Sequence, residues 1–213
     1  MFKTNTVFVL GAGASQEAGL PIGSDLKQKI AEKLYISFQD GYRRTSGDGV
    51  IYDAILTHAQ QAKEEANEYL RQCRVISTAI PQAISIDNFL DAHQGNEKLE
   101  LCAKLAIVSG ILEAEAKSNL KFDEFKPEGF SPANLAGTWY ENVWMLLNEG
   151  VRANSLEHLF GNVSFIIFNY DRCLEHFLFH SVQNYYRIDA NSASDLVQQI
   201  KITHPYGVVG KLP

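Results

Sequence analysis

A short apolar run followed by a glycine-rich turn, close to the amino terminus, constrains the fold more than any other feature of this sequence. Val7 to Leu10 contain β-branched and aromatic side chains and are followed by Gly11, a pattern that predicts a buried strand. Gly11 and Gly13 allow the backbone to turn sharply and to approach a ligand without a Cβ in the way. From Ser15 onward the sequence is polar and compatible with a helix.

A strand, a glycine turn and a helix N-terminus together favour an anion site, because free N–H groups and the helix dipole point at the same place. The natural ligand of such a turn is a nucleotide diphosphate. The dinucleotide fingerprint is incomplete here, since Gln16 stands at the third glycine position. The turn alone therefore leaves two alternatives open, a nucleotide site and a plain tight turn before a helix.

Composition excludes several other classes of protein. The 213 residues are enough for one domain with a substantial core, and the net charge of −6 argues against nucleic-acid binding through the whole surface. No apolar run is long enough to span a membrane, and we expect no secretory signal, since the apolar run near the amino terminus is only four residues long. The three cysteines lack C-x-x-C spacing, which predicts buried thiols in a reducing compartment and no zinc ribbon. We expect a cytoplasmic protein.

Two further strand candidates end in polar residues. Asn162–Phe168 is followed by Asn169, Tyr170 and Asp171, and Lys201–Thr203 is followed by His204. If the three strands are adjacent and parallel, the loops at their carboxyl ends line one crevice. We therefore predict an α/β fold with a Rossmann-like parallel sheet, spanning residues 1–213 as a single domain, with a large helical insertion at residues 25–160 between the first and second motif-bearing strands.

The rest of the chain is predicted with coarser bounds. Ser24 is the expected N-cap of a helix to about Phe38, followed by a polar loop from Gly41 to Gly49. Val75 to Ile84 is predicted as a strand or a loop, Ser85 to Leu90 as a capped helix start, and Tyr185 to Ile188 as a short strand. Further helices are expected at residues 51–73, 97–118, 132–148 and 172–182, with Trp139 and Trp144 in the core.

The three polar blocks resemble those of a known family. Gly11-Ala12-Gly13-Ala14-Ser15 with Gly19-Leu20-Pro21, then Phe168-Asn169-Tyr170-Asp171, then Thr203-His204-Pro205-Tyr206-Gly207 look like the sequence blocks of the SIR2 (sirtuin-like) superfamily. The Asn-Tyr-Asp version and the preceding Ser85–Leu90 are more similar to bacterial SIR2-like domains of antiphage defence proteins than to protein deacylases.

The resemblance implies a role for each matching residue. Asn169 and His204 would be catalytic, with Asn169 beside the nicotinamide ribose and His204 as the general base. The NAD+ contacts would come from Gly11, Ala12, Gly13, Ser15, Pro21, Asp87 and Asp171. Among these, Asp171 would brace the Asn169 loop and Asp87 would lie on the nicotinamide side. The other five histidines (His58, His93, His158, His176 and His180) are expected to be surface or packing residues.

These residue types suit cleavage of the N-glycosidic bond of NAD+, because nicotinamide is a good leaving group and the protein mainly supplies orientation and electrostatics. The resemblance therefore implies a NAD+ glycohydrolase (NADase) that releases nicotinamide and ADP-ribose as an antiviral defence effector. NAD+ would be the substrate, without a metal. A NAD- or ADP-ribose-binding regulatory module without turnover and a NAD-dependent deacylase are the alternatives, and a redox enzyme ranks lowest.

Two departures from the family pattern qualify the resemblance. The zinc ribbon that sirtuins carry has no ligands here, which disfavours the deacylase. Family members also continue with at least one more strand after the histidine block, so we expect this chain to lack its C-terminal strand or strands. Such effectors act as homo-oligomers or with a further C-terminal or partner domain, and the sequence predicts neither a membrane nor a nucleic-acid partner.

Overall fold

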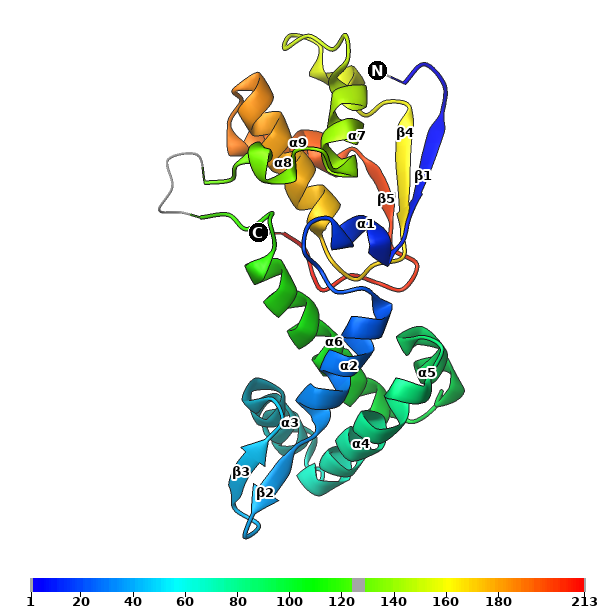
Figure 1. The fold of residues 1–213 in the computed structure, drawn as a ribbon, viewed down its shortest axis with the longest axis vertical. Helices are drawn as coiled ribbons and strands as arrows, with labels where there is room; N and C mark the ends of the chain where they lie inside the picture. Colours follow the sequence, from blue (N-terminus) through cyan, green and yellow to red (C-terminus); the bar gives the residue numbers. More distant parts are fainter. Residues whose placement is uncertain (1, 124–128, 213) are drawn as a thin grey trace. The chain divides into compact units, whose positions relative to one another are not determined.

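The computed structural model describes residues 2–123 and 129–212 (Figure 1). Within these ranges the chain is an α/β protein with a three-stranded parallel sheet. It divides into two compact units. Met1–Leu20 and Ala114–Pro213 form the sheet unit, and Pro21–Glu113 form the helical unit. The placement of the helical stretch as an insertion at residues 25–160 within a single domain stays a prediction.

The sheet has the strand order β1-β4-β5, with β1 at Thr6–Leu10, β4 at Val163–Ile167 and β5 at Lys201–Thr203. β1 pairs in parallel with β4 along its whole length, and β4 pairs in parallel with β5. The three predicted strands and their parallel pairing are thereby confirmed. Because β4 has a neighbour on each side, it is the central strand, and its alternate residues Val163, Phe165 and Ile167 are buried.

The helices of the sheet unit are α1 (Ala12–Gln16), α7 (Trp139–Asn148), α8 (Cys173–Tyr186) and α9 (Ala190–Gln198). Side chains of α7 and α8 pack with those of β4 in one apolar core, which includes Tyr140, Leu147, Phe165, Phe177 and Leu178. The helix predicted from Arg172 to Val182 is confirmed, but it runs on to Tyr186. The short strand predicted at Tyr185–Ile188 is wrong, since Tyr185 and Tyr186 belong to α8 and Arg187 caps this helix in the left-handed region, with a φ of 56°.

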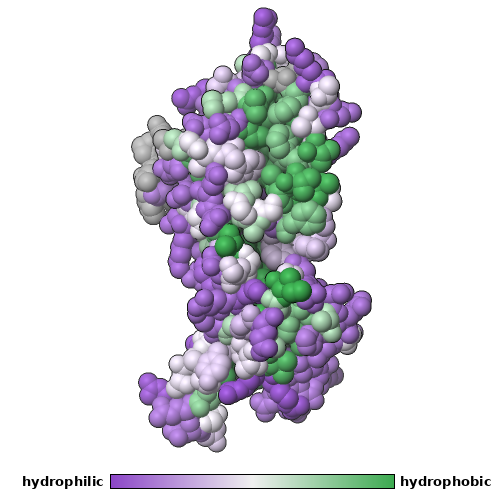
Figure 2. All heavy atoms as spheres, turned by 45° about the vertical axis from the view of Figure 1, so that its right-hand side comes forward, coloured by the Kyte–Doolittle hydropathy of each residue, from purple (hydrophilic) through white to green (hydrophobic). Residues whose placement is uncertain are grey.

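β1 is partly buried on one face and exposed on the other. Phe8 stacks on Phe165 with their ring centroids 5.3 Å apart, whereas Val7 and Val9 are 56% and 64% exposed. Successive side chains of a strand point to opposite faces of the sheet, so the face that carries Val7 and Val9 lies outside the core. Figure 2 shows hydrophobic side chains on the surface of the sheet unit where β1 lies. The expectation of a fully buried first strand was therefore wrong for this face.

The helical unit is built from six helices and a two-stranded hairpin within the described residues: α2 (Gly23–Leu34), β2 (Ser37–Gln39), β3 (Arg43–Ser46), α3 (Gly49–Ala62), α4 (Ala66–Ala79), η1 (Ile80–Gln82), α5 (Ile86–Ala92) and the first part of α6 (Glu97–Lys117). Its buried apolar residues recur at helical spacing, as Leu26, Ile30 and Leu34 do on α2. Cys73 and Cys102 are buried here and Cys173 in the sheet unit, and none of the three forms a disulfide, as predicted.

Four local predictions in the helical unit were wrong. The single helix expected at residues 51–73 is two helices, α3 and α4, because the chain leaves the helical conformation at Lys63, whose φ is 57°. The helix expected from Ser24 to Phe38 begins at Gly23 and ends at Leu34, and the expected polar loop from Gly41 to Gly49 contains strand β3, which pairs with β2. The segment Val75–Ile84, expected as strand or loop, is mostly helical. Short polar strands and helix ends carry little hydrophobic periodicity, so their sequence does not distinguish them from loops.

Candidate functional site

The carboxyl ends of β1 and β4 bring the glycine turn next to the Asn169 loop. Leu10 pairs with Ile167 in the ladder, and the N–H of Phe168 donates to the carbonyl of Leu10 at 2.9 Å. The third strand, β5, ends beside them, since its Thr203 pairs with Ile166. The loops that carry the three predicted motifs therefore leave the same edge of the sheet (Figure 1).

The glycine turn is open on its outer side. A Cβ built on Gly11 or Gly13 would meet no heavy atom within 4 Å, so neither glycine is required by a close contact within the described protein. The helix that follows, α1, starts at Ala12 and has only five residues. Few peptide dipoles are aligned in so short a helix, so the loop N–H groups contribute more than the dipole to any attraction for an anion.

Three predicted residues form one buried hydrogen-bond network. The side-chain Nδ2 of Asn169 donates to the carbonyl of Gly11 at 3.1 Å and to Ser15 Oγ at 2.7 Å. Ser15 Oγ in turn donates to Asp171 Oδ1 at 3.0 Å. Ser15, Asn169 and Asp171 are all buried. The glycine turn is thereby joined to a loop more than 150 residues away in sequence.

The carboxylate of Asp171 has an unfavourable environment for its charge. Burial raises its pKa, and the hydrogen bonds from Ser15 and from the backbone N–H of Cys173, 3.1 Å from Oδ1, only partly offset this effect. The carboxylate of Glu115 raises the pKa further. A buried acid whose pKa is raised, at the carboxyl ends of parallel strands, is a candidate functional residue.

Two aromatic residues, Trp139 and Tyr140, lie beside this network. Trp139 Nε1 donates to the carbonyl of Ala14 at 2.7 Å, and its backbone N–H donates to Glu17 at 2.7 Å. Trp139 and Tyr140 line the space beside Ser15, Asn169 and Asp171, which has a volume of about 10 Å³. A space of this volume holds one water molecule. Trp139, expected in the core, is half-buried and attached to the glycine turn.

His204 contacts the network through the backbone of Asn169. Its Nδ1 lies 3.0 Å from the carbonyl oxygen of Asn169, and its Nε2 lies 2.9 Å from Glu175 Oε1 on α8. The hydrogen bond to Glu175 is the largest cause of a raised pKa of His204, against the opposing effect of burial. The ring of His204 is therefore directed at Glu175, and its two hydrogen bonds do not reach Ser15 or the glycine turn.

Glu175 was not predicted from the sequence as a functional residue. It follows Asp171 by four positions at the start of a predicted helix, and residues at this spacing lie on one face of a helix. This spacing is the sequence pattern from which a position of Glu175 near Asp171 could have been predicted. Arg172, between them, is held by Glu115, whose carboxylate accepts from the backbone N–H at 2.9 Å and from Nη2 at 2.6 Å.

The remaining predicted NAD+ contacts are Ala12, Pro21 and Asp87. Ala12 is the first residue of α1 and is half-buried. Pro21 and Asp87 belong to the helical unit. Asp87 lies in the first turn of α5, where Ser85 Oγ accepts the N–H of Asn88 at 3.0 Å, so the predicted capped helix start is confirmed. A role of Pro21 and Asp87 at the NAD+ site stays a prediction.

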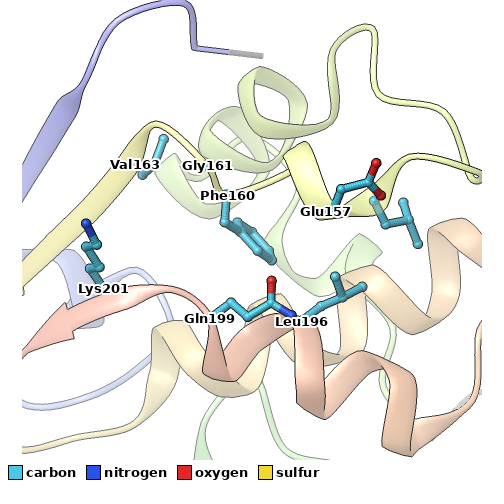
Figure 3. A pocket seen from close by; sticks show the side chains of 8 residues that line it. Glu157, Phe160, Gly161, Val163, Leu196, Gln199 and Lys201 are labelled. Atoms are coloured by element: carbon cyan, nitrogen blue, oxygen red, sulfur yellow. The ribbon is translucent and has the colours of Figure 1, made fainter.

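Two other cavities lie in the sheet unit. The larger has a volume of about 730 Å³, and its wall includes Phe179, Ile202, Glu175 and His204. The smaller, of about 100 Å³, lies near the amino ends of β4 and β5, where Val163 and Lys201 line it (Figure 3). Ligands of parallel sheets bind at the carboxyl ends of the strands, so the smaller cavity is on the wrong side of the sheet for a cofactor site.

Within residues 2–123 and 129–212, no three histidine, cysteine or acidic side chains are arranged to hold a metal ion. In the same ranges, no helix is both long and apolar enough to cross a membrane. Comparisons with models of protein families, with curated proteins and with solved structures find no match for this chain.

Proposed function

We propose that this chain is a SIR2-like NAD+ glycohydrolase with a Rossmann-like fold. In the proposed reaction, water attacks the nicotinamide ribose, the N-glycosidic bond breaks, and the products are nicotinamide, ADP-ribose and a proton. The observation that carries the proposal is the buried Ser15–Asn169–Asp171 network against the open glycine turn. The likeness of the three sequence blocks to the sirtuin-like superfamily supplies the identity of the substrate.

The chemistry of the network fits this reaction. The transition state for loss of nicotinamide carries positive charge on the ribose, which an ionised Asp171 nearby would stabilise. The amide of Asn169 can orient a hydroxyl or a water molecule without adding charge. His204 would accept the proton that the attacking water loses, because an imidazole titrates near neutral pH.

Substrate binding in this proposal requires a local movement. The space beside Ser15, Asn169 and Asp171 holds about one water molecule, which is too small for a nicotinamide ring. Trp139, which lines this space and is attached to Ala14 by one hydrogen bond, is the side chain whose displacement would enlarge it. The carboxamide of nicotinamide could then replace the hydrogen bond that Asn169 donates to Ser15.

The test is release of nicotinamide from NAD+ by the purified protein, followed by chromatography. Asn169→Ala and His204→Ala should each reduce the rate by about 100-fold or more, a loss within the range for an orienting or acid–base group. The matched controls are Asn162→Ala, whose side chain donates to the carbonyl of Phe2 at the other end of β4, and the exposed His158→Ala. No release by the wild-type protein, or equal rates in the His204 and His158 variants, would refute the proposal.

A second candidate is a module that binds NAD+ or ADP-ribose without turnover. The observation in its favour is that both ring nitrogens of His204 face hydrogen-bond acceptors, Asn169 O and Glu175 Oε1, so no lone pair is free to accept a proton. Calorimetric titration with ADP-ribose distinguishes the two. Binding that Ser15→Ala weakens, together with intact NAD+ after long incubation, would favour the module over the enzyme.

The biological setting is a further part of the same proposal. A role in bacterial antiphage defence, activation by a trigger, and assembly into a homo-oligomer or with a partner domain all derive from the sequence resemblance. Sedimentation of the purified protein with and without NAD+ tests the assembly. A monomer under both conditions would remove the oligomer from the proposal.

A further inference from the structure

Glu175 is placed to control the proton of His204. It lies in the first turn of α8, and its Oε1 is 2.9 Å from His204 Nε2. The two side chains are 20% and 10% exposed. No sequence block that resembles the sirtuin-like superfamily contains Glu175, and its contact with His204 joins residues 29 positions apart.

The hydrogen-bond pattern restricts the protonation of this pair. A neutral imidazole has one N–H, whereas an imidazolium has two. Since Asn169 O can only accept, Nδ1 must carry a hydrogen. Nε2 must then donate to an ionised Glu175 or accept from a protonated one. In both arrangements neither nitrogen of His204 has a lone pair that is free for a substrate or a water molecule.

The charges around the pair favour the ionic arrangement. Glu175 and Asp171 both raise the pKa of His204, as does the carbonyl of Asn169. Arg172, on the same helix, is held by Glu115, and Lys211 of the C-terminal segment lines the same cavity as the pair. In the described part of the chain, Glu175 Oε2 is buried without a hydrogen-bond partner. A carboxylate in this situation is stabilised by keeping its cationic partner close.

We propose that Glu175 is a positioning residue that acts as a brake, holding His204 with both nitrogens occupied until the Glu175–His204 contact opens. The brake rests on the proposed function, because it restrains the group assigned there as the base. The contact faces the cavity of about 730 Å³, which gives the His204 ring and the Glu175 carboxylate a route to separate. The protein in this conformation is then a resting state.

The test uses Glu175→Gln, which keeps the shape of the side chain and removes its charge. The pKa of His204 should fall, as followed by NMR titration of its ring signals, which His204→Gln assigns. Nicotinamide release at pH 6 to 6.5 should increase by several-fold, because each unit of lowered pKa gives up to about tenfold more neutral imidazole below the pKa. The acid limb of the pH–rate profile should move to lower pH.

The matched control is Glu157→Gln, which removes the charge from the exposed pair of Glu157 and His158, 3.4 Å apart; it should leave the His204 titration and the rate unchanged. If Glu175→Gln does not fold, Glu175→Ala gives the same two readouts. An unchanged His204 titration overturns the inference. So does a lowered pKa with slower release at every pH, which would make Glu175 a support of the reaction.

Failure of the proposed function gives a different result. The His204 titration would still shift in Glu175→Gln, but neither that variant nor the wild-type protein would release nicotinamide at any pH. In that case the control of Glu175 over the His204 proton stands and the glycohydrolase does not.

Discussion

The two units of this protein use the same local device with opposite electrostatic results. In each, an aspartate stands just before a helix and accepts a backbone N–H of its first turn. In the helical unit, Asp48 Oδ1 accepts from Val50 at 2.8 Å and from Ile51 at 3.2 Å. In the sheet unit, Asp171 Oδ1 accepts from Cys173 at 3.1 Å. Both contacts satisfy donors that a helix start leaves free.

The difference lies in how the charge is compensated. Burial raises the pKa of Asp48, but the hydrogen bonds from Lys33, 2.7 Å away, from Ile51 and from Ser109 outweigh burial and leave the pKa lowered. At Asp171, burial dominates and the pKa is raised. A carboxylate with a lowered pKa stabilises the native protein at neutral pH, whereas one with a raised pKa destabilises it. Asp48 therefore stabilises the folded protein at neutral pH, whereas the ionised Asp171 destabilises it.

The largest expected effect is at Asp48. Asp48→Ala removes the helix cap and leaves Lys33 with Glu113, 2.9 Å away, as its remaining partner. We expect a loss of about 3 kcal/mol in the free energy of unfolding, measured by urea denaturation. The control is Asp53→Ala, an exposed position within α3, which should change stability by less than about 0.5 kcal/mol. Equal effects of the two changes would contradict the role assigned to Asp48.

Lowering the pH should remove the contribution of Asp48 to the free energy of unfolding. Its pKa is lower in the folded than in the unfolded protein, so its stabilisation is fully present above the unfolded value and is lost as the pH falls through the folded value. Asp48→Asn should lower the free energy of unfolding by about 1 to 2 kcal/mol at pH 7. Urea denaturation of both proteins from pH 7 to pH 2 should show this difference shrinking below pH 4. A difference that is independent of pH would mean that charge is not the cause.

Asp171→Asn should change the free energy of unfolding in the opposite direction. Asparagine can accept the hydrogen bonds from Ser15 and Cys173 without a buried charge, so we expect a gain of about 1 kcal/mol in the free energy of unfolding at pH 7, a typical size for a stabilising substitution. Because the folded pKa is raised, the gain should disappear as the pH falls through that value and the aspartate becomes neutral. Calorimetric melting at several pH values measures it, and a loss of stability at pH 7 would break the contrast with Asp48.

The smallest expected effects are the same in both units. Lys63 is the C-cap of α3 and Arg187 is the C-cap of α8, with φ of 57° and 56°. Lys63→Gly and Arg187→Gly should each stabilise the protein by about 0.5 to 1 kcal/mol, since glycine adopts the left-handed region without strain. Gln60→Gly, inside α3, is the control and should destabilise by about 1 kcal/mol. Melting temperatures measure these changes in stability. A lower melting temperature for Lys63→Gly or Arg187→Gly would show that the long side chains stabilise these helix ends.

The strand ends were predictable because they follow local patterns. A run such as Val163–Ile167 is apolar, rich in β-branched residues and bounded by polar ones, and the parallel order follows from the long sequence between the runs. The helix α8 was predicted over most of its length, and its buried Leu174, Phe177, Leu178 and Val182 recur at helical spacing. The polar hairpin β2–β3 and the end of α8 at Arg187 were not, because backbone conformation there depends on few residues and weak preferences.

The sequence by itself determined that polar loops follow three apolar strands and that glycines open the first of them. Only the tertiary structure decided which side chains meet there: Asn169 on Ser15, Trp139 on Ala14 and Glu175 on His204. The physical reason is that such contacts join residues from 29 to 154 positions apart. Their hydrogen bonds depend on how helices pack on the sheet, and no spacing along the chain records this packing.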